Sequence, residues 1–90
     1  DTVVNDYPHQ RQVMISIIND LINEGLVSDR KNIVWAALTD SVLIVNGENQ
    51  PETLHQKLKT KYDIVADRGY YYGPVKIYGK GYFFDSTDLK

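Results

Sequence analysis

Two short apolar runs on either side of Asp40-Ser41 constrain the fold more than any other feature of this sequence. If Asp40-Ser41 forms the turn of a β-hairpin, residues of like character meet in pairs on one face: Leu38 with Leu43, Ala36 with Val45, and Val34 with Gly47. The opposite face then collects Ile33, Trp35, Ala37 and Ile44. Asp-Ser is a weaker turn signal than Asn-Gly, so a longer turn that includes Thr39 stays open. Either turn gives a hairpin that is apolar on both faces.

The segment before the hairpin has a helical pattern. Apolar residues recur at steps of one, three and four positions: Val13, Met14, Ile17, Ile18, Leu21 and Ile22. Pro8 suits the first helical position, and Gly25 suits a left-handed stop with Leu26 folding back on the last turn. The pattern predicts a helix from Pro8 to the residue before Gly25.

A second helix is predicted after the hairpin. Asn46-Gly47 could form a further hairpin turn, but we expect it to end the strand because a helical pattern follows closely. Pro51 suits the first position of that helix. A narrow apolar stripe then follows at four-residue spacing: Leu54, Leu58 and Tyr62. The predicted helix runs from Pro51 to Tyr62.

The C-terminal part is rich in aromatic residues and glycine. In an extended chain, one face carries Val75, Ile77, Gly79, Gly81 and Phe83, and the other carries Lys76, Tyr78, Lys80, Tyr82 and Phe84. Gly79 and Gly81 would let a helix or a neighbouring backbone approach closely, or would bend the strand at a bulge. Alternatively, a turn at Gly79-Lys80-Gly81 would give a short hairpin. The sequence therefore predicts one long final strand or a second hairpin.

These elements predict an α+β fold. Residues 1–7 form a flexible lead-in, and residues 8–90 form a single α+β domain. The order is helix, β-hairpin, helix and β, with an antiparallel sheet and the helices on one face.

Charge and composition exclude several classes of function. The formal net charge is −2 and the isoelectric point is about 5.5, which gives no electrostatic reason to approach a nucleic acid. The chain has no cysteine, so disulfide scaffolds and thiolate chemistry are excluded. It begins at Asp1 rather than Met, so we expect any signal peptide or membrane anchor to belong to a missing segment of a parent protein.

A run of motifs between Glu24 and Tyr62 resembles a module of envelope proteins from Bacteroidetes-type bacteria. The residues that carry the likeness are Gly25-Leu26, Leu43, Val45-Asn46-Gly47, Gln50-Pro51, His55, Lys57 and Tyr62. The module is similar to the region that follows the peptidase part of membrane sensors of the beta-lactam antirepressor type. The His-Glu-x-x-His hallmark of the peptidase is absent from this chain. The resemblance therefore implies a non-catalytic accessory module outside the cytoplasm.

Candidate chemistries in the chain are sparse. Glu52 and His55 have the three-residue spacing that some carboxylate-bridged metal sites use, but no full ligand set accompanies them. The simpler interpretation is that Glu52 favours the helix start and His55 is a hydrogen-bonding surface residue. No serine lies in a Gly-x-Ser-x-Gly pattern. We expect no catalytic residue, no metal and no cofactor.

The prediction of function depends on the second face of the sheet. Two helices in a chain this short can cover only one face, so apolar residues would remain on the other. We expect that face to bind a protein partner or another copy through Ile33, Trp35, Ile44, Lys76, Tyr78, Lys80 and Tyr82. The alternatives are a glycan- or peptide-binding domain that stacks its tyrosines on a ligand and, after it, a small hydrolase. Equally open is that the tyrosine-rich segment folds over the face and covers it.

Overall fold

The computed structural model describes residues 7–73 and 81–85 of the chain. Its helices and strands are α1 (Tyr7–Asn23), the 3-10 helix η1 (Arg30–Asn32), β1 (Ala36–Leu38), β2 (Leu43–Val45), β3 (Glu48–Asn49), α2 (Glu52–Lys61), β4 (Gly69–Tyr72) and β5 (Gly81–Phe84). The predicted α+β class is confirmed, and so is the order of helix, hairpin, helix and β.

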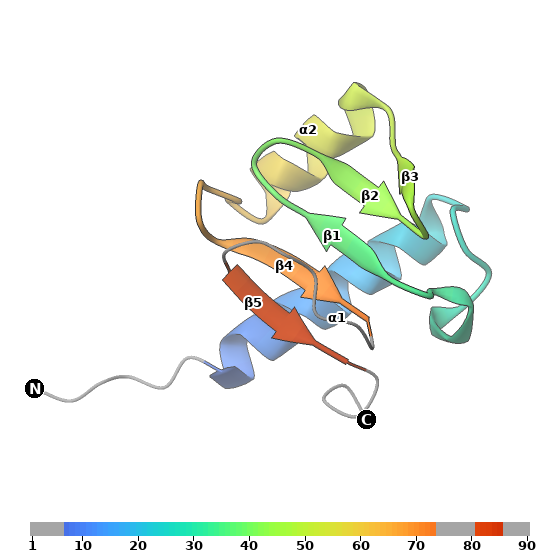
Figure 1. Cartoon of the computed structure of the whole chain (residues 1–90), viewed down its shortest axis with the longest axis horizontal. Coiled ribbons are helices and arrows are strands. Elements are labelled where there is room, and N and C mark those ends of the chain that lie inside the picture. Colours follow the sequence, from blue (N-terminus) through green and yellow to red (C-terminus); the bar gives the residue numbers. More distant parts are fainter. Residues whose placement is uncertain (1–6, 74–80, 86–90) are drawn as a thin grey trace, which may run out of the picture.

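The strands form one sheet in the order β3-β2-β1-β4-β5, so β1 lies at its centre. Both helices lie behind this sheet (Figure 1), as the sequence predicts. Within the described residues, no helix is both long and apolar enough to cross a membrane.

The predicted hairpin register is confirmed for its two inner pairs. The predicted place of Val34 on the core side is wrong, because Val34 lies before β1 and is 64% exposed. β1 and β2 are antiparallel, with Ala36 opposite Val45 and Leu38 opposite Leu43. Asp40-Ser41 forms the turn, which Thr39 closes by donating its N–H to the carbonyl of Val42 at 2.9 Å. The Thr39 hydroxyl oxygen also accepts the N–H groups of Ser41 and Val42, each at 3.1 Å. These side-chain bonds explain why a turn without glycine holds the two-residue geometry.

The expectation that Asn46-Gly47 only ends a strand is wrong. Both residues have positive φ, 52° and 83°, and they connect β2 to the antiparallel strand β3. Two successive positive φ angles define the hairpin turn for which Asn-Gly is the preferred sequence. α2 begins at Glu52, after β3 has ended at Asn49, so the chain has room for both the hairpin turn and the helix.

One hydrophobic core fills the space between the helices and the sheet. On α1 the predicted stripe is buried: Met14, Ile17, Ile18 and Leu21 are each at most 2% exposed. The helix ends as predicted, because Gly25 has φ of 81° and the N–H of Leu26 reaches the carbonyl of Leu21 at 3.1 Å. Leu58 is the fully buried contribution of α2 to this core.

The C-terminal strands differ from the prediction of an entirely antiparallel sheet. β4 and β5 pair in parallel, and β4 also pairs with β1 in antiparallel fashion, so the sheet is mixed. β4 lies in a stretch from which the sequence predicted no strand. The parallel register sets Tyr70 beside Tyr82 and Tyr72 beside Phe84. All four rings therefore face α1, on the side of the sheet that carries Ala36 and Leu38.

Two glycines bring β4 and β5 together. Gly81 lies opposite Gly69, and a Cβ atom at Gly81 would lie 2.0 Å from the carbonyl oxygen of Gly69. Gly81 also has φ of 147°, which side-chain-bearing residues rarely adopt. The sequence anticipated a close backbone approach at Gly81, and the neighbouring strand is the backbone concerned.

Candidate functional site

The face of the sheet that points away from the helices carries the second set of apolar residues. Within the strands these are Ala37, Ile44, Tyr71 and Phe83, and Trp35 immediately precedes β1. Among the strand residues that the structure describes, none on this face is charged; the others are Asn49, Gly69 and Gly81. This face looks toward the viewer in Figure 1.

The centre of this face is buried and its periphery is partly exposed. Ala37 and Tyr71 are 4% and 6% exposed, whereas Phe83 is 45% exposed. Trp35 and Ile44 have intermediate exposure. The rings of Tyr71 and Phe83 stack with their centroids 4.5 Å apart and their planes within 10°. The exposed apolar rim thus consists of Trp35, Ile44 and Phe83, and we call it the aromatic rim.

Glycines allow these aromatic side chains to lie close to the sheet. A Cβ atom at Gly69 would lie 3.0 Å from the Tyr71 hydroxyl oxygen, and one at Gly73 would lie 2.8 Å from the Cβ of Trp35. Larger residues at either position would push the rings outward. The glycines that flank the three consecutive tyrosines are therefore part of the packing of this face.

Ile33 does not belong to this face, contrary to the prediction. It is the C-cap of η1, is 6% exposed and packs in the main core with the helix residues. Strict alternation fails there because β1 begins only at Ala36. Chain geometry before a strand need not follow the two-residue period of the strand itself.

Tyr82 is placed differently from the prediction, and three further predicted contact residues lie outside the described residues. Tyr82 faces the helix side, where its ring centroid is 5.0 Å from that of Tyr70 and it packs against the core. Lys76, Tyr78 and Lys80 lie outside the described residues. A stacking platform that uses Tyr82 on the same face as Trp35 is thus not formed.

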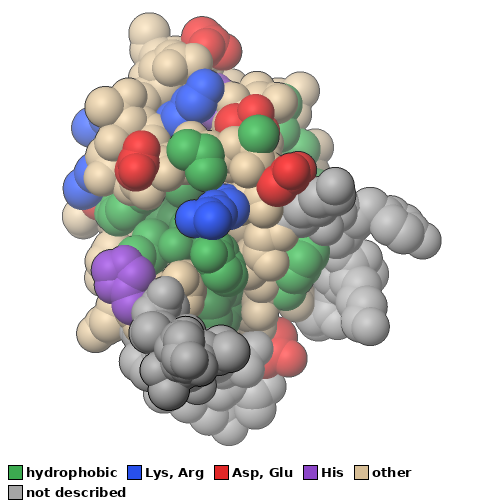
Figure 2. All heavy atoms as spheres, turned by 90° about the vertical axis from the view of Figure 1, so that its left-hand side faces the viewer, with side chains coloured by type: hydrophobic (Ala, Val, Ile, Leu, Met, Phe, Trp, Pro, Cys, Tyr) green, Lys and Arg blue, Asp and Glu red, His purple; other side chains and the backbone are tan. Residues whose placement is uncertain are grey.

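The side of the molecule that includes β5 and the α2–β4 connection has its own apolar surface. Figure 2 shows a band of hydrophobic side chains down the middle of this side, with a basic side chain across it and acidic side chains around it. Val65, in the connection between α2 and β4, is 44% exposed. Tyr62 and Tyr82 are partly buried against the core. Charges of both signs interrupt this surface, unlike the strand residues of the aromatic rim.

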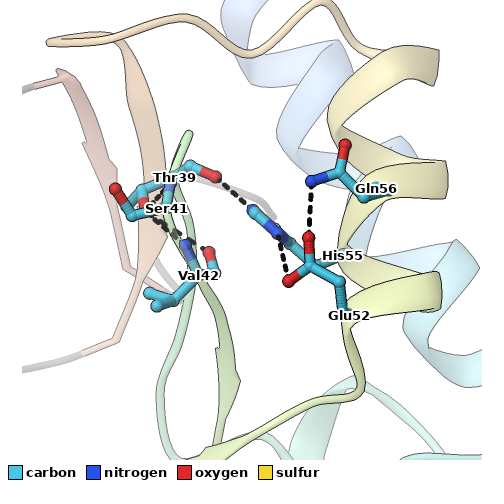
Figure 3. Close-up of polar contacts among 6 residues, drawn as sticks. All are labelled: Thr39, Ser41, Val42, Glu52, His55 and Gln56. Carbon is cyan, nitrogen blue, oxygen red and sulfur yellow. Dashed lines mark hydrogen bonds and ion pairs between the residues drawn. The ribbon is translucent and has the colours of Figure 1, made fainter.

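A polar pocket lies between the β1–β2 turn and the start of α2. Its volume is about 160 Å³ and its lining residues are Ser41, Val42, Leu43, Asn49, Gln50, Glu52 and His55. His55 is only 2% exposed, which corrects the prediction of a surface histidine. Its Nε2 lies 2.8 Å from the carbonyl oxygen of Thr39, which fixes α2 against the turn (Figure 3). Its position three residues before Leu58, on the flank of the stripe, is the only signal in the sequence for this burial.

Ionic and hydrogen-bonded contacts join the two helices. The Tyr62 hydroxyl donates to the Asp20 carboxylate at 2.5 Å, and Lys61 donates to the same carboxylate at 2.9 Å. Burial and the hydrogen bond to Asp20 raise the pKa of Tyr62 far above its ordinary value. Lys57 donates to Glu24 at 2.6 Å, and this hydrogen bond raises the pKa of Lys57. These groups hold α2 beside α1.

No family model, curated protein or solved structure gives a significant match to this chain.

The residues behind the predicted family resemblance have architectural positions. Leu43 and Val45 are in the core, and His55 and Tyr62 make the contacts described above. The Asn46 side chain accepts the N–H of Val34 at 2.6 Å and donates to the carbonyl of Asn32 at 3.0 Å. The motif therefore accounts for how the hairpin and α2 are joined. Within residues 7–73 and 81–85, no three His, Cys, Asp or Glu side chains cluster as metal ligands.

Proposed function

We propose that this chain is a protein-interaction module that docks through the aromatic rim, and that its partner is a second copy of the chain. The observation that carries the proposal is the combination of a 45% exposed Phe83 with the partly exposed Trp35 and Ile44 on a sheet face without charged strand residues. Aromatic side chains are enriched where protein interfaces bind most strongly.

The absence of charge among these strand residues favours self-association. Two copies that meet through this face would not bring like charges together, which is the usual obstacle to the pairing of identical surfaces. A two-fold axis would place the Phe83 of one copy near the rim of the other. The buried centre of the face limits the apolar area available, so we expect a weak, reversible dimer rather than an obligate one.

Sedimentation velocity over a concentration series tests this proposal. The wild-type chain should show a rising weight-average sedimentation coefficient, and Phe83→Ser should return it to the monomer value. Val65→Ser is the matched control, because Val65 has almost the same exposed fraction but lies outside the sheet. Circular dichroism checks that each variant is folded.

Two results would contradict the proposal. One is a sedimentation coefficient that stays monomeric up to millimolar concentration; the other is an equal loss of association in Phe83→Ser and Val65→Ser. An Ile44→Lys variant adds a second test, since a charge on each copy should oppose dimerisation through this face.

We further propose that the module works outside the cytoplasm as an accessory part of an envelope protein. The resemblance of the segment from Glu24 to Tyr62 is the only support for this location. Reading the gene through its full open frame, followed by cell fractionation of the tagged full-length product, tests it. Recovery of the product in the cytoplasmic fraction would overturn this part of the proposal.

A further inference from the structure

The histidine of the polar pocket is oriented in a way that packing alone does not require. A carbonyl oxygen can only accept a hydrogen bond, so His55 Nε2 must carry the proton that it donates to Thr39 at 2.8 Å. In the neutral ring, Nδ1 then presents a lone pair. This atom is buried and has no hydrogen-bond partner. A buried acceptor that is left unsatisfied costs free energy, so its presence points to a ligand.

Glu52 is oriented toward the same atom. One of its carboxylate oxygens accepts a hydrogen bond from the Gln56 side chain at 2.7 Å, and the other lies 3.9 Å from His55 Nδ1. Figure 3 shows the carboxylate between the two residues, on the first turns of α2. With neutral His55, two acceptors face each other across this gap. A bound cation between them would offset the repulsion of the two lone pairs.

We propose that Glu52 and His55 form a binding site for a divalent transition-metal ion, with Zn²⁺ as the probe. Imidazole nitrogen and carboxylate oxygen each bind Zn²⁺ at about 2.1 Å, which places them about 3.4 Å apart at a tetrahedral angle. The observed 3.9 Å is about half an ångström wider. The Glu52 side chain is 74% exposed, so it is free to close that difference.

The surroundings of the two side chains match those of known metal ligands. A metal-binding histidine usually donates its other ring N–H to a backbone carbonyl or a carboxylate, and ligating carboxylates are themselves hydrogen-bonded. The Thr39 carbonyl and the Gln56 amide have these roles here. Both orienting contacts are present before any ion binds, so little ordering is needed on binding.

Among the described residues, this site has fewer acidic and imidazole ligands than a closed structural zinc site. Gln50 lines the same pocket and offers a side-chain oxygen, and solvent completes the coordination. The affinity should therefore be lower than that of a four-ligand site.

Isothermal titration calorimetry of the full chain with ZnCl₂ at pH 7.5 tests the proposal. We expect one ion per chain, and an affinity at least about tenfold lower in Glu52→Gln. Gln56→Ala should also weaken binding by about tenfold, because loss of an orienting partner typically costs ten- to a hundredfold. Exposed Glu52 and Gln56 can be replaced without opening the core, and circular dichroism verifies the fold.

Two controls separate this site from general surface binding. His9→Gln removes the other histidine, which is exposed on α1, and Glu48→Gln removes an exposed carboxylate on β3. Both should leave the affinity unchanged. In ¹⁵N spectra of the imidazole groups, Zn²⁺ should shift His55 Nδ1 more than Nε2.

The opposite findings would overturn the proposal. They are the absence of Zn²⁺ binding up to millimolar concentration, equal affinity in Glu52→Gln, or loss of binding in His9→Gln instead. Any of these would leave His55 with the role of holding α2 against the β1–β2 turn.

Discussion

The part of the molecule up to α2 and the part made by β4 and β5 are specified in different ways. From α1 to α2, each element has a local signal: a helical stripe, a glycine stop, two turns and a proline before a helix. β4 and β5 are parallel strands, which a two-residue hairpin turn cannot join. Their position is fixed by pairing with β1 and with each other, and by contact with α1.

This difference shows where each part is vulnerable. In the first part, stability depends on side chains that complete local geometry, such as Asn46 and Thr39. In the second, it depends on residues that leave room, above all Gly69 and Gly81. Substitutions should therefore act by loss of a bond in one part and by steric clash in the other.

The largest effect is expected from Gly81→Ala. The added Cβ would lie 2.0 Å from the Gly69 carbonyl oxygen, at a φ that alanine rarely adopts. The strands would have to separate, and we expect a loss of about 3 kcal/mol or more in the free energy of unfolding. Urea denaturation followed by circular dichroism measures it.

Gly25→Ala is the matched control for this prediction. Gly25 also has positive φ, 81°, but a Cβ atom there would meet nothing within 4 Å. Only the backbone strain remains, so the loss should be about 1 kcal/mol. If the two variants lose the same stability, close packing of β4 on β5 is not what fixes the second part.

A smaller effect is expected from Asn46→Ala in the first part. The variant loses the bonds to the Val34 N–H and the Asn32 carbonyl, together with the tolerance of asparagine for φ of 52°. We expect a loss of about 2 kcal/mol. Asn46→Gly restores the backbone freedom but not the bonds, so it should recover about half of the loss. Full recovery by glycine would show that the side-chain bonds contribute nothing.

The contact between Tyr62 and Asp20 should make the free energy of unfolding decrease at alkaline pH. The folded-state pKa of Tyr62 is raised above its ordinary value of about 10 by burial and by Asp20. The folded state therefore holds this proton more tightly than the unfolded state. The contribution is fully present below about pH 10 and is lost as the pH rises further.

Tyr62→Phe should reduce this alkaline loss and should lower stability at pH 7 by about 1 kcal/mol. Urea denaturation at pH 7, 9 and 10.5 measures both effects. Tyr70, whose pKa is also raised by burial, remains in the variant, so the alkaline slope should decrease without vanishing. An unchanged slope would mean that Tyr62 does not keep its proton through the bond to Asp20.

The smallest effect is expected from Lys57→Met. Lys57 pairs with Glu24 at 2.6 Å on the surface, where solvent screens the interaction. The loss of stability should be the smallest of these variants and should disappear in 1 M NaCl. A loss as large as that of Tyr62→Phe that persists in salt would place this pair among the determinants of the first part.

The sequence predicts the first part well because its signals are local. The helix stripe that includes Ile17 and Leu21, the register of Ala36 with Val45, and the α2 stripe around Leu58 all follow from spacing. The Asn46-Gly47 turn was readable as well, since Asn-Gly is the strongest short hairpin signal. The helical pattern that follows closely after it favours the wrong interpretation, in which Asn46-Gly47 only ends the strand.

The second part and the pocket were not predictable in the same way. β4 is recognisable only once β1 is known to need a partner on its other edge, which no local window contains. The burial of His55 depends on a hydrogen bond to Thr39, sixteen residues earlier. Ile33 does not follow the two-residue alternation of the strand because β1 begins only at Ala36. Ile44 lies on its predicted face because it pairs with Ala37, and Trp35, directly before β1, lies on the same face.

The central position of β1 suggests the sequence of events during synthesis. β1, β2 and β3 leave the ribosome as neighbours and can pair within microseconds, whereas β1 must wait for Tyr72 before its other edge is filled. Until then the nascent chain would present an unpaired β1 edge, the type of surface on which chaperones act. Pulsed hydrogen exchange on refolding chains should therefore protect the Ala36–Leu38 amides that bond to β2 earlier than the amides of β4.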